Sequence, residues 1–80
     1  MLSELKAGPR VVGAKQTRRA IDSGTAVQVF LAEDADPKVT EPVEALCIQR
    51  GVSVEKIASM RELGAACGIA VGAAVAALVR

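Results

Sequence analysis

The run Ala26 to Ala32 limits the possible folds of this chain more than any other feature. It carries β-branched and other apolar residues at positions that point to both sides of an extended backbone. A strand of this kind is covered on both faces, as in sheets that pack helices on each side. Segments with helical character precede and follow it, so the sequence predicts an α/β fold with a mixed, four-stranded sheet.

Signals for the ends of elements are clear in the first half of the chain. A short strand is predicted at Arg10–Val12 and a helix from Ala14 to Ser23, which Gly24 ends in a left-handed conformation. After an acidic loop, Asp36 has the side chain of an N-cap and Pro37 suits the first helical position. These residues predict that a new helix begins at Pro37.

Pro42 is expected to break that helix into a short first turn and a longer second piece that ends at Arg50-Gly51. The S-x-x-E pattern that begins at Ser59 has the form of a capping box and predicts the start of another helix. The remaining expected elements are a strand over 52–57, the helix from Ser59 toward Cys67, its closing residue Gly68, and a buried strand over 70–79.

Composition indicates one small globular domain over residues 1–80. The chain is 51% hydrophobic, which is enough apolar material for a core. Phe30 is the only aromatic residue, so a ligand that needs an aromatic stacking platform is excluded. The formal net charge is only +1, but basic residues concentrate within residues 1–20 and acidic residues within 22–44.

Metal binding, secretion and membrane insertion find no support in the sequence. The chain has no histidine, and Cys47 and Cys67 are too far apart for a C-x-x-C pair, so both are interpreted as buried thiols. No signal peptide is evident at the N-terminus. The longest uncharged run, Ala65 to Val79, is shorter than the about 20 residues that span a bilayer. We expect a cytoplasmic protein without cofactors, and nothing demands more than a monomer.

The first motif with chemical content is Gly13-Ala14-Lys15-Gln16-Thr17-Arg18-Arg19-Ala20. On a helix, Ala14, Thr17 and Ile21 form one stripe, while Lys15, Gln16 and Arg19 point away from it. The helix start also offers unpaired backbone N–H groups and partial positive charge, which suit a phosphate or a polar base edge. The alternative is an ordinary solvated face.

The second motif extends from Ile57 to Ile69 and joins an apolar loop to the capped helix. Its Leu-Gly-x-x-Cys-Gly-Ile ending contains Gly64 and Gly68. Both glycines have a purely structural interpretation, since Gly64 permits close packing of the helix and Gly68 permits the turn into the last strand.

With the loop Glu33-Asp34-Ala35-Asp36-Pro37 between them, these motifs resemble the kink-turn RNA-binding family of large-subunit ribosomal proteins, the L-seven-Ae group, in its short bacterial form. The resemblance extends from about Arg10 to Val79. It implies a three-layer α/β/α sandwich, no enzymatic activity, and binding to an RNA internal loop in which tandem sheared G·A pairs flank a bulge. Ribosomal RNA, a riboswitch and other structured transcripts remain open as partners; no DNA or membrane is implied.

By this resemblance the first motif meets the G·A pairs. Gly13 and Ala14 let the backbone come close, Lys15 and Gln16 reach base edges, and Arg19 reaches guanine or phosphate. Many relatives have Asn-Glu in place of Lys-Gln. The replacement offers an amide oxygen where a Glu would accept from guanine, so affinity and base preference are expected to differ.

By the same resemblance the second motif covers the nucleotide that is extruded from the bulge. The covering loop consists of Ile57, Ala58, Ser59 and Met60, and Arg61 adds a phosphate contact. Relatives often carry proline and a basic residue where this chain has Ala58 and Met60. Met60 has a second interpretation as a side chain that fills a gap in the core.

Two other classes of function stay under consideration. A protein–protein adaptor would use the acidic region Glu33–Glu44 to dock a basic partner, and the Lys15 face would then be mere surface. An enzyme is disfavoured, because the chain has no histidine, no nucleophile beside a base, and no G-x-x-x-x-G-K phosphate loop. Asp34 and Asp36 are explained by capping and loop solvation without a metal.

Overall fold

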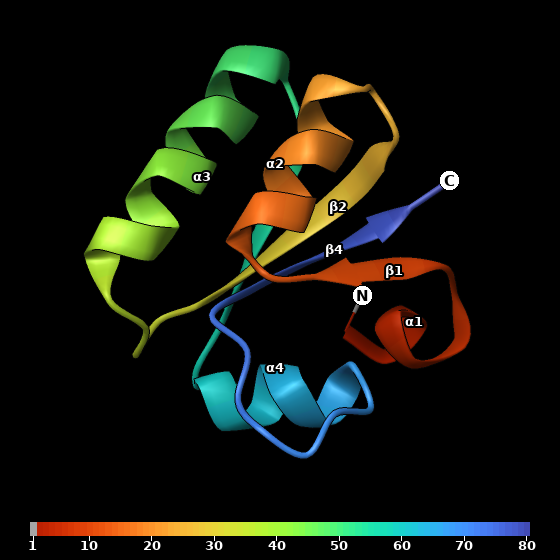
Figure 1. Cartoon of the computed structure of the whole chain (residues 1–80), viewed down its shortest axis with the longest axis vertical. Helices are drawn as coiled ribbons and strands as arrows, with labels where there is room; N and C mark the ends of the chain where they lie inside the picture. Colours follow the sequence, from red (N-terminus) through yellow and green to blue (C-terminus); the bar gives the residue numbers. More distant parts are fainter. Residues whose placement is uncertain (1) are drawn as a thin grey trace.

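Helices and strands alternate along the chain in the computed structural model, which describes residues 2–80 (Figure 1). In chain order the elements are α1 (Leu2–Ala7), β1 (Arg10–Val12), α2 (Ala14–Asp22), β2 (Ala26–Ala32), α3 (Pro37–Arg50), β3 (Ser53–Ile57), α4 (Met60–Ala66) and β4 (Val75–Val79). The bounds predicted for β1, α2 and β2 are confirmed to within one residue.

The four strands form one mixed sheet in the order β1-β4-β2-β3. Strands β2 and β3 are parallel, with Ala32 opposite Ile57, whereas β4 runs antiparallel to both β1 and β2. In the antiparallel pairs Val12 lies opposite Ala76 and Leu31 opposite Val75. The ends of β1, β2 and β3 and the start of β4 therefore lie at the same edge of the sheet.

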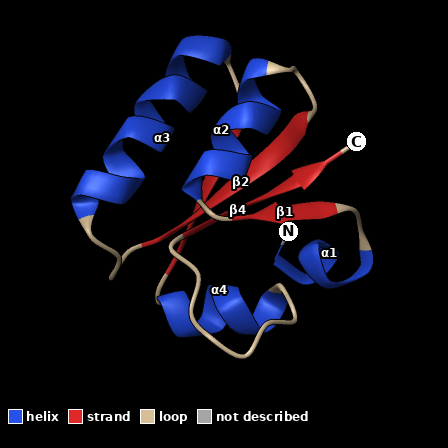
Figure 2. Ribbon diagram, in the orientation of Figure 1, coloured by secondary structure: helices blue, strands red, loops and turns tan. Residues whose placement is uncertain are grey.

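Helices cover both faces of this sheet, which confirms the three-layer α/β/α sandwich. Helices α2 and α3 lie side by side on one face, while α1 and α4 lie on the other (Figure 2). Strand β2 contributes to both layers because its side chains alternate: Phe30 packs into the cluster beneath α1 and α4, and Val29 and Leu31 pack into the cluster beneath α2 and α3. Only its start is open, where Val27 is 50% exposed.

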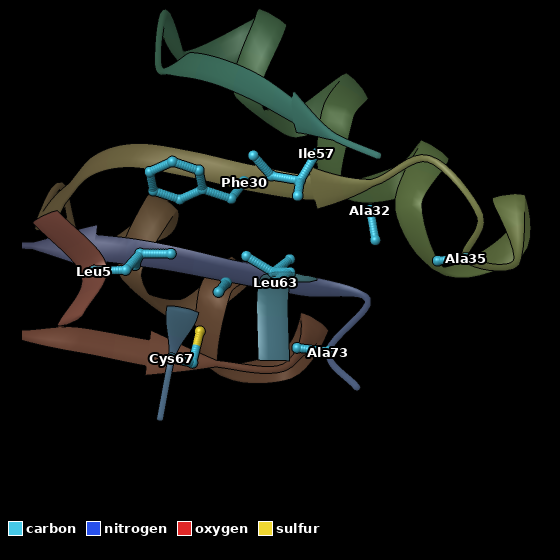
Figure 3. Close-up of a cluster of buried hydrophobic side chains, with 9 residues drawn as sticks. Leu5, Phe30, Ala32, Ala35, Ile57, Leu63, Cys67 and Ala73 are labelled. Carbon is cyan, nitrogen blue, oxygen red and sulfur yellow. The ribbon is translucent and has the colours of Figure 1, made fainter. Parts of the chain in front are cut away.

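The lone aromatic side chain anchors the α1/α4 layer. Phe30 is fully buried, and Leu5 of α1, Leu63 of α4 and Cys67 join the same cluster (Figure 3). Helix α1 was not among the predicted elements. It is a short segment of six residues, and Leu5 is the buried apolar residue among those whose side chains are described, 4–7, so a helical period is hard to detect in the sequence.

Helix α3 is continuous from Pro37 to Arg50, so the break predicted at Pro42 is wrong. Its start is as predicted, since the Asp36 side chain accepts a hydrogen bond from the Lys38 backbone N–H at 3.0 Å. A proline removes one N–H and strains one turn. Because Pro42 is exposed while buried Val43 and Cys47 hold the helix against the sheet, packing outweighs that local cost.

The last strand begins at Val75, five residues after the predicted start at Ala70. Residues 67–74 instead form a long connection that packs back on α4. The Cβ that a side chain at Gly64 would carry lies 2.1 Å from the Val71 carbonyl oxygen, so this close approach depends on a glycine. The apolar residues of 70–74 therefore belong to a loop that packs on α4, and not to a strand.

Candidate functional site

Four connecting segments meet where β1, β2 and β3 end and β4 begins, and we call this end of the sheet the loop edge. Backbone hydrogen bonds hold the segments together. The Gly13 N–H donates to the Val75 carbonyl at 2.8 Å, and the Glu33 N–H donates to the Ile57 carbonyl at 2.7 Å. Both predicted motifs and the acidic loop between them thus lie together, although they are far apart in the sequence.

The start of α2 is shaped by Gly13. Its φ of 103° is a conformation that residues with a side chain rarely adopt. No side chain caps this helix start, so the first N–H groups of α2 are open to an external acceptor. Lys15 and Gln16 follow at once, and both are exposed. The structure therefore places these side chains beside unpaired backbone donors.

The two faces of α2 divide as the sequence predicted. Thr17 and Ile21 are buried, and Ala14 packs against the same core cluster. Lys15, Gln16 and Arg19 are exposed, and so are Arg18 and the last residue of the helix, Asp22. At about 100° per residue, Arg19 lies about 60° from Gln16 around the axis, whereas Arg18 lies about 160° away. Arg19 consequently lies between Lys15 and Gln16 around the axis, whereas Arg18 lies about 60° beyond Lys15, on the side away from Gln16.

Ser59 is the N-cap of α4, as its place in the S-x-x-E pattern predicted, although the Glu62 carboxylate meets the Ser59 hydroxyl and not its backbone N–H. The Ser59 hydroxyl accepts a hydrogen bond from the Glu62 backbone N–H at 3.1 Å, and it donates to the Glu62 carboxylate at 3.4 Å. The Met60 N–H donates to the Asp34 carboxylate at 2.7 Å, and the Met60 carbonyl accepts from the Ala73 N–H at 3.0 Å. Two other segments, the acidic loop and the connection between α4 and β4, thus fix the backbone of Met60 at the loop edge.

The connection between α4 and β4 also belongs to this site, and the sequence prediction missed it. Ile69 and Val71 are exposed apolar residues, the latter to 72%. With Met60, Arg61 and Asp34 they line a shallow pocket of about 440 Å³. Glycines at both ends of the apolar run 69–71 were the available signal, because glycine pairs favour turns over a strand.

Asp34 is expected to set the position of Met60 rather than to bind a ligand. Replacement of Asp34 by alanine removes the acceptor for the Met60 N–H, and we expect a loss of about 1 kcal/mol in the free energy of unfolding. Asp34→Asn keeps an oxygen at that place and should cost less. Chemical denaturation followed by circular dichroism measures both; equal losses would show that the hydrogen bond is not the cause.

Basic side chains of the site are available to an anion. Arg50 pairs with Asp22 at 3.0 Å and Lys56 pairs with Glu44 at 3.3 Å. Neither of these ion pairs involves Lys15, Arg19 or Arg61, and no carboxylate is paired with those three side chains in the described part of the chain. Their charge is therefore not neutralised by a neighbouring carboxylate.

The described residues contain neither an exposed cysteine nucleophile nor a cluster of metal ligands. Cys47 and Cys67 are buried free thiols, as predicted. Burial raises the pKa of both thiols; Glu44 raises that of Cys47 further, and Arg10 partly offsets the effect at Cys67. Across residues 2–80, no three His, Cys, Asp or Glu side chains gather as a metal site would require. Nor does any described helix have the length and apolar character to traverse a bilayer.

Comparison with known proteins decides the family. The model of the ribosomal protein L7Ae/L30e/S12e/Gadd45 family matches residues 3–80. The chain belongs to this family. The resemblance seen in the sequence motifs is thereby confirmed.

Similar proteins agree with this assignment. A protein of Geobacillus sp. strain WCH70 named as an RNA-binding protein is 49% identical over 76 residues, covering 95% of this chain and 93% of that protein. Large ribosomal subunit protein eL8 of Halobacterium salinarum is 38% identical over 68 residues, which is 84% of this chain and 57% of that protein. The solved structure of the Giardia lamblia 15.5kD RNA binding protein superposes with a TM-score of 0.92 at 30% identity, covering 99% of this chain and 70% of that one.

Proposed function

We propose that this chain is a non-enzymatic, ribosome-associated RNA-binding protein of the cytoplasm that recognises kink-turns and stabilises their bent form. The observation that carries the proposal is the meeting of two features at the loop edge. One is the donor-rich start of α2, and the other is the apolar pocket beside α4. Relatives named as RNA-binding and ribosomal proteins support it.

The start of α2 suits the edges of sheared G·A pairs. Gly13 and Ala14 present little side-chain bulk, so the backbone N–H groups can approach a base or phosphate. Lys15 and Arg19 can donate to guanine O6 and N7, and Gln16 can donate and accept at once. The major groove of a regular RNA helix is too narrow for such contacts, whereas a kinked internal loop opens it.

The pocket beside α4 suits a base that has left the stack. Met60, Ile69 and Val71 supply exposed apolar surface around it, and Arg61 supplies a cation at its rim. No aromatic residue is available there, so the base would lie against aliphatic side chains instead of stacking on a ring. Arg61 can then hold the phosphate of the same nucleotide. Ile57 is buried beneath the loop and supports it.

Binding in this way would shift a conformational equilibrium of the RNA. A free internal loop of RNA samples extended and bent forms. Only the bent form can place the G·A pairs at the start of α2 and the extruded base in the pocket beside α4 at the same time. The shift is limited by the difference in affinity for the two forms. Cationic contacts supply attraction that weakens with salt, while Gln16 and the pocket supply discrimination.

A titration with two RNAs tests the proposal. One RNA carries a kink-turn, and in the other the sheared G·A pairs are replaced by Watson–Crick pairs. Two altered base pairs at about 1–3 kcal/mol each predict binding to the control that is weaker by about thirtyfold or more. Equal affinities for the two RNAs would rule out kink-turn recognition.

The acidic region Glu33–Glu44 is less suited to a basic protein partner than its composition suggests. Asp34 and Asp36 are engaged in hydrogen bonds with the backbone, and Glu44 is paired with Lys56. These three carboxylates are therefore already bonded within the chain and are less available to a basic partner. If neither RNA binds in the titration above, an adaptor function becomes the alternative to test.

A further inference from the structure

A groove follows the flank of α2 that faces β1. It has a volume of about 340 Å³, and Val11 and Val79 form part of its apolar lining. Its polar lining includes Gln16, Arg19 and Arg80. Because Gln16 belongs to the candidate interface at the loop edge, the groove continues that interface toward the opposite end of the sheet. We call it the α2 groove.

Arg80 is held at the far end of the α2 groove by the turn that follows α2. Its backbone N–H donates to the Thr25 carbonyl at 3.0 Å. Its guanidinium donates to the Gly24 carbonyl through Nε at 3.3 Å and Nη2 at 3.0 Å. The hydroxyls of Ser23 and Thr25 lie 3.0 Å apart and both donate to the Ala20 carbonyl, which braces the turn. The guanidinium is thus oriented while several of its five N–H donors stay available.

The charge of the α2 groove is not neutralised. In the described part of the chain neither Arg19 nor Arg80 has a carboxylate partner. Arg50, near the same end of the molecule, differs because its Nη2 lies 3.0 Å from the Asp22 carboxylate. The two arginines of the groove therefore present net positive charge along one flank of the helix, whereas Arg50 does not.

We propose that the α2 groove is a second RNA contact, which holds backbone phosphates of one stem next to the kink, with Arg80 as its outer phosphate ligand. From Gln16 to Ser23 the helix rises about 10 Å. That length exceeds the spacing of neighbouring phosphates on one nucleic-acid strand, so the groove can meet more than one of them. Guanidinium groups match phosphate geometry, and beyond Gln16 and Arg19, which face the kink, Arg80 is the charged side chain that lines the groove. This inference rests on the proposed function and extends its footprint.

Arg80→Ala and Arg80→Gln test the inference in the full chain, with Arg50→Ala as the matched control. Affinity is measured over a series of salt concentrations for a kink-turn RNA and for versions with either stem shortened. Loss of one phosphate contact predicts about fivefold weaker binding at 0.15 M salt, and a slope of log K against log salt that is smaller by about one. Both Arg80 variants should show it, and Arg50→Ala should not. Shortening one of the two stems should abolish the difference between wild type and Arg80→Ala.

The possible outcomes separate the two proposals. If wild type prefers the kink-turn but the Arg80 variants bind with unchanged affinity and salt slope, Arg80 only caps the end of α2 and the inference fails alone. If Arg80→Ala still loses affinity for both RNAs with a shortened stem, the Arg80 contact lies within the kink, and this outcome also overturns the inference. If wild type has no preference for the kink-turn, the proposed function fails, and the inference fails with it. Melting curves followed by circular dichroism report whether each variant is folded.

Discussion

Replacement of Gly64 by alanine is expected to destabilise the chain by more than about 3 kcal/mol, because overpacking against backbone atoms cannot be relieved by a change of rotamer. The new Cβ would lie 2.1 Å from the Val71 carbonyl oxygen and 3.0 Å from the Gly72 Cα. Helix propensity alone predicts the opposite sign, since alanine is favoured over glycine inside a helix by up to about 1 kcal/mol. The loss would be a large share of a small domain's total stability.

Gly51→Ala is the matched control for this prediction. A Cβ at Gly51 meets no atom within 4 Å, so its cost is confined to the left-handed φ of 69° and amounts to about 1–2 kcal/mol. The chain lacks tryptophan and tyrosine, so urea unfolding is followed by far-UV circular dichroism. If Gly64→Ala proves as stable as wild type, the connection 67–74 does not pack on α4 as described.

The second large effect is expected at Arg19. Arg19→Ala should weaken binding to a kink-turn RNA by about fivefold to more than a hundredfold, as expected for the loss of a bidentate contact to guanine worth about 1–3 kcal/mol. Arg18→Ala removes the same charge from a position about 160° from Gln16 around α2. Because Arg18 is assigned no phosphate or base contact, its removal should leave the salt dependence of binding unchanged and cost less affinity than Arg19→Ala.

Fluorescence anisotropy with labelled RNA measures both arginine variants under identical salt. Their unfolding free energies should stay close to that of wild type, because both side chains are exposed and unpaired within the described residues. Equal losses of affinity for the two variants would show that the binding flank of α2 has been assigned incorrectly.

The sequence predicts well those elements whose ends are decided by one residue and its neighbours. Asp36 and Ser59 cap α3 and α4 as expected, because capping is a local contact between a side chain and the next turn, and Pro37 takes the first position of α3. Strand β2 is identified by apolar residues on both faces. Gly24 ends α2 with a φ of 77°, as its type suggests.

Errors arose where tertiary packing opposes the local signal. Pro42 stays inside α3 because Val43 and Cys47 hold that helix on the sheet. Apolar residues from Ala70 to Ala74 form a loop rather than a strand, because α4 approaches them through Gly64. Such contacts join residues distant in the chain, so a pattern read along the sequence does not contain them.

The candidate site was predicted in part. Gly13, Lys15 and Gln16 lie at the start of α2, with Arg19 further along the same flank in its last turn, and the loop before α4 lies at the same edge of the sheet. The exposed apolar run 69–71 beside Met60 was not foreseen, because its loop was expected to be a strand. That these segments meet follows from the strand order, which composition and spacing do not reveal.

The most direct test of RNA bending uses a kink-turn RNA with a donor and an acceptor dye on its two stems, in salt at which the free RNA is mostly extended. Addition of the chain should raise energy transfer until one chain is bound per RNA. Gln16→Ala should need more protein to reach the same transfer, and an RNA with Watson–Crick pairs in place of the G·A pairs should stay extended. Binding without a rise in transfer, or an equal rise for both RNAs, would contradict the account.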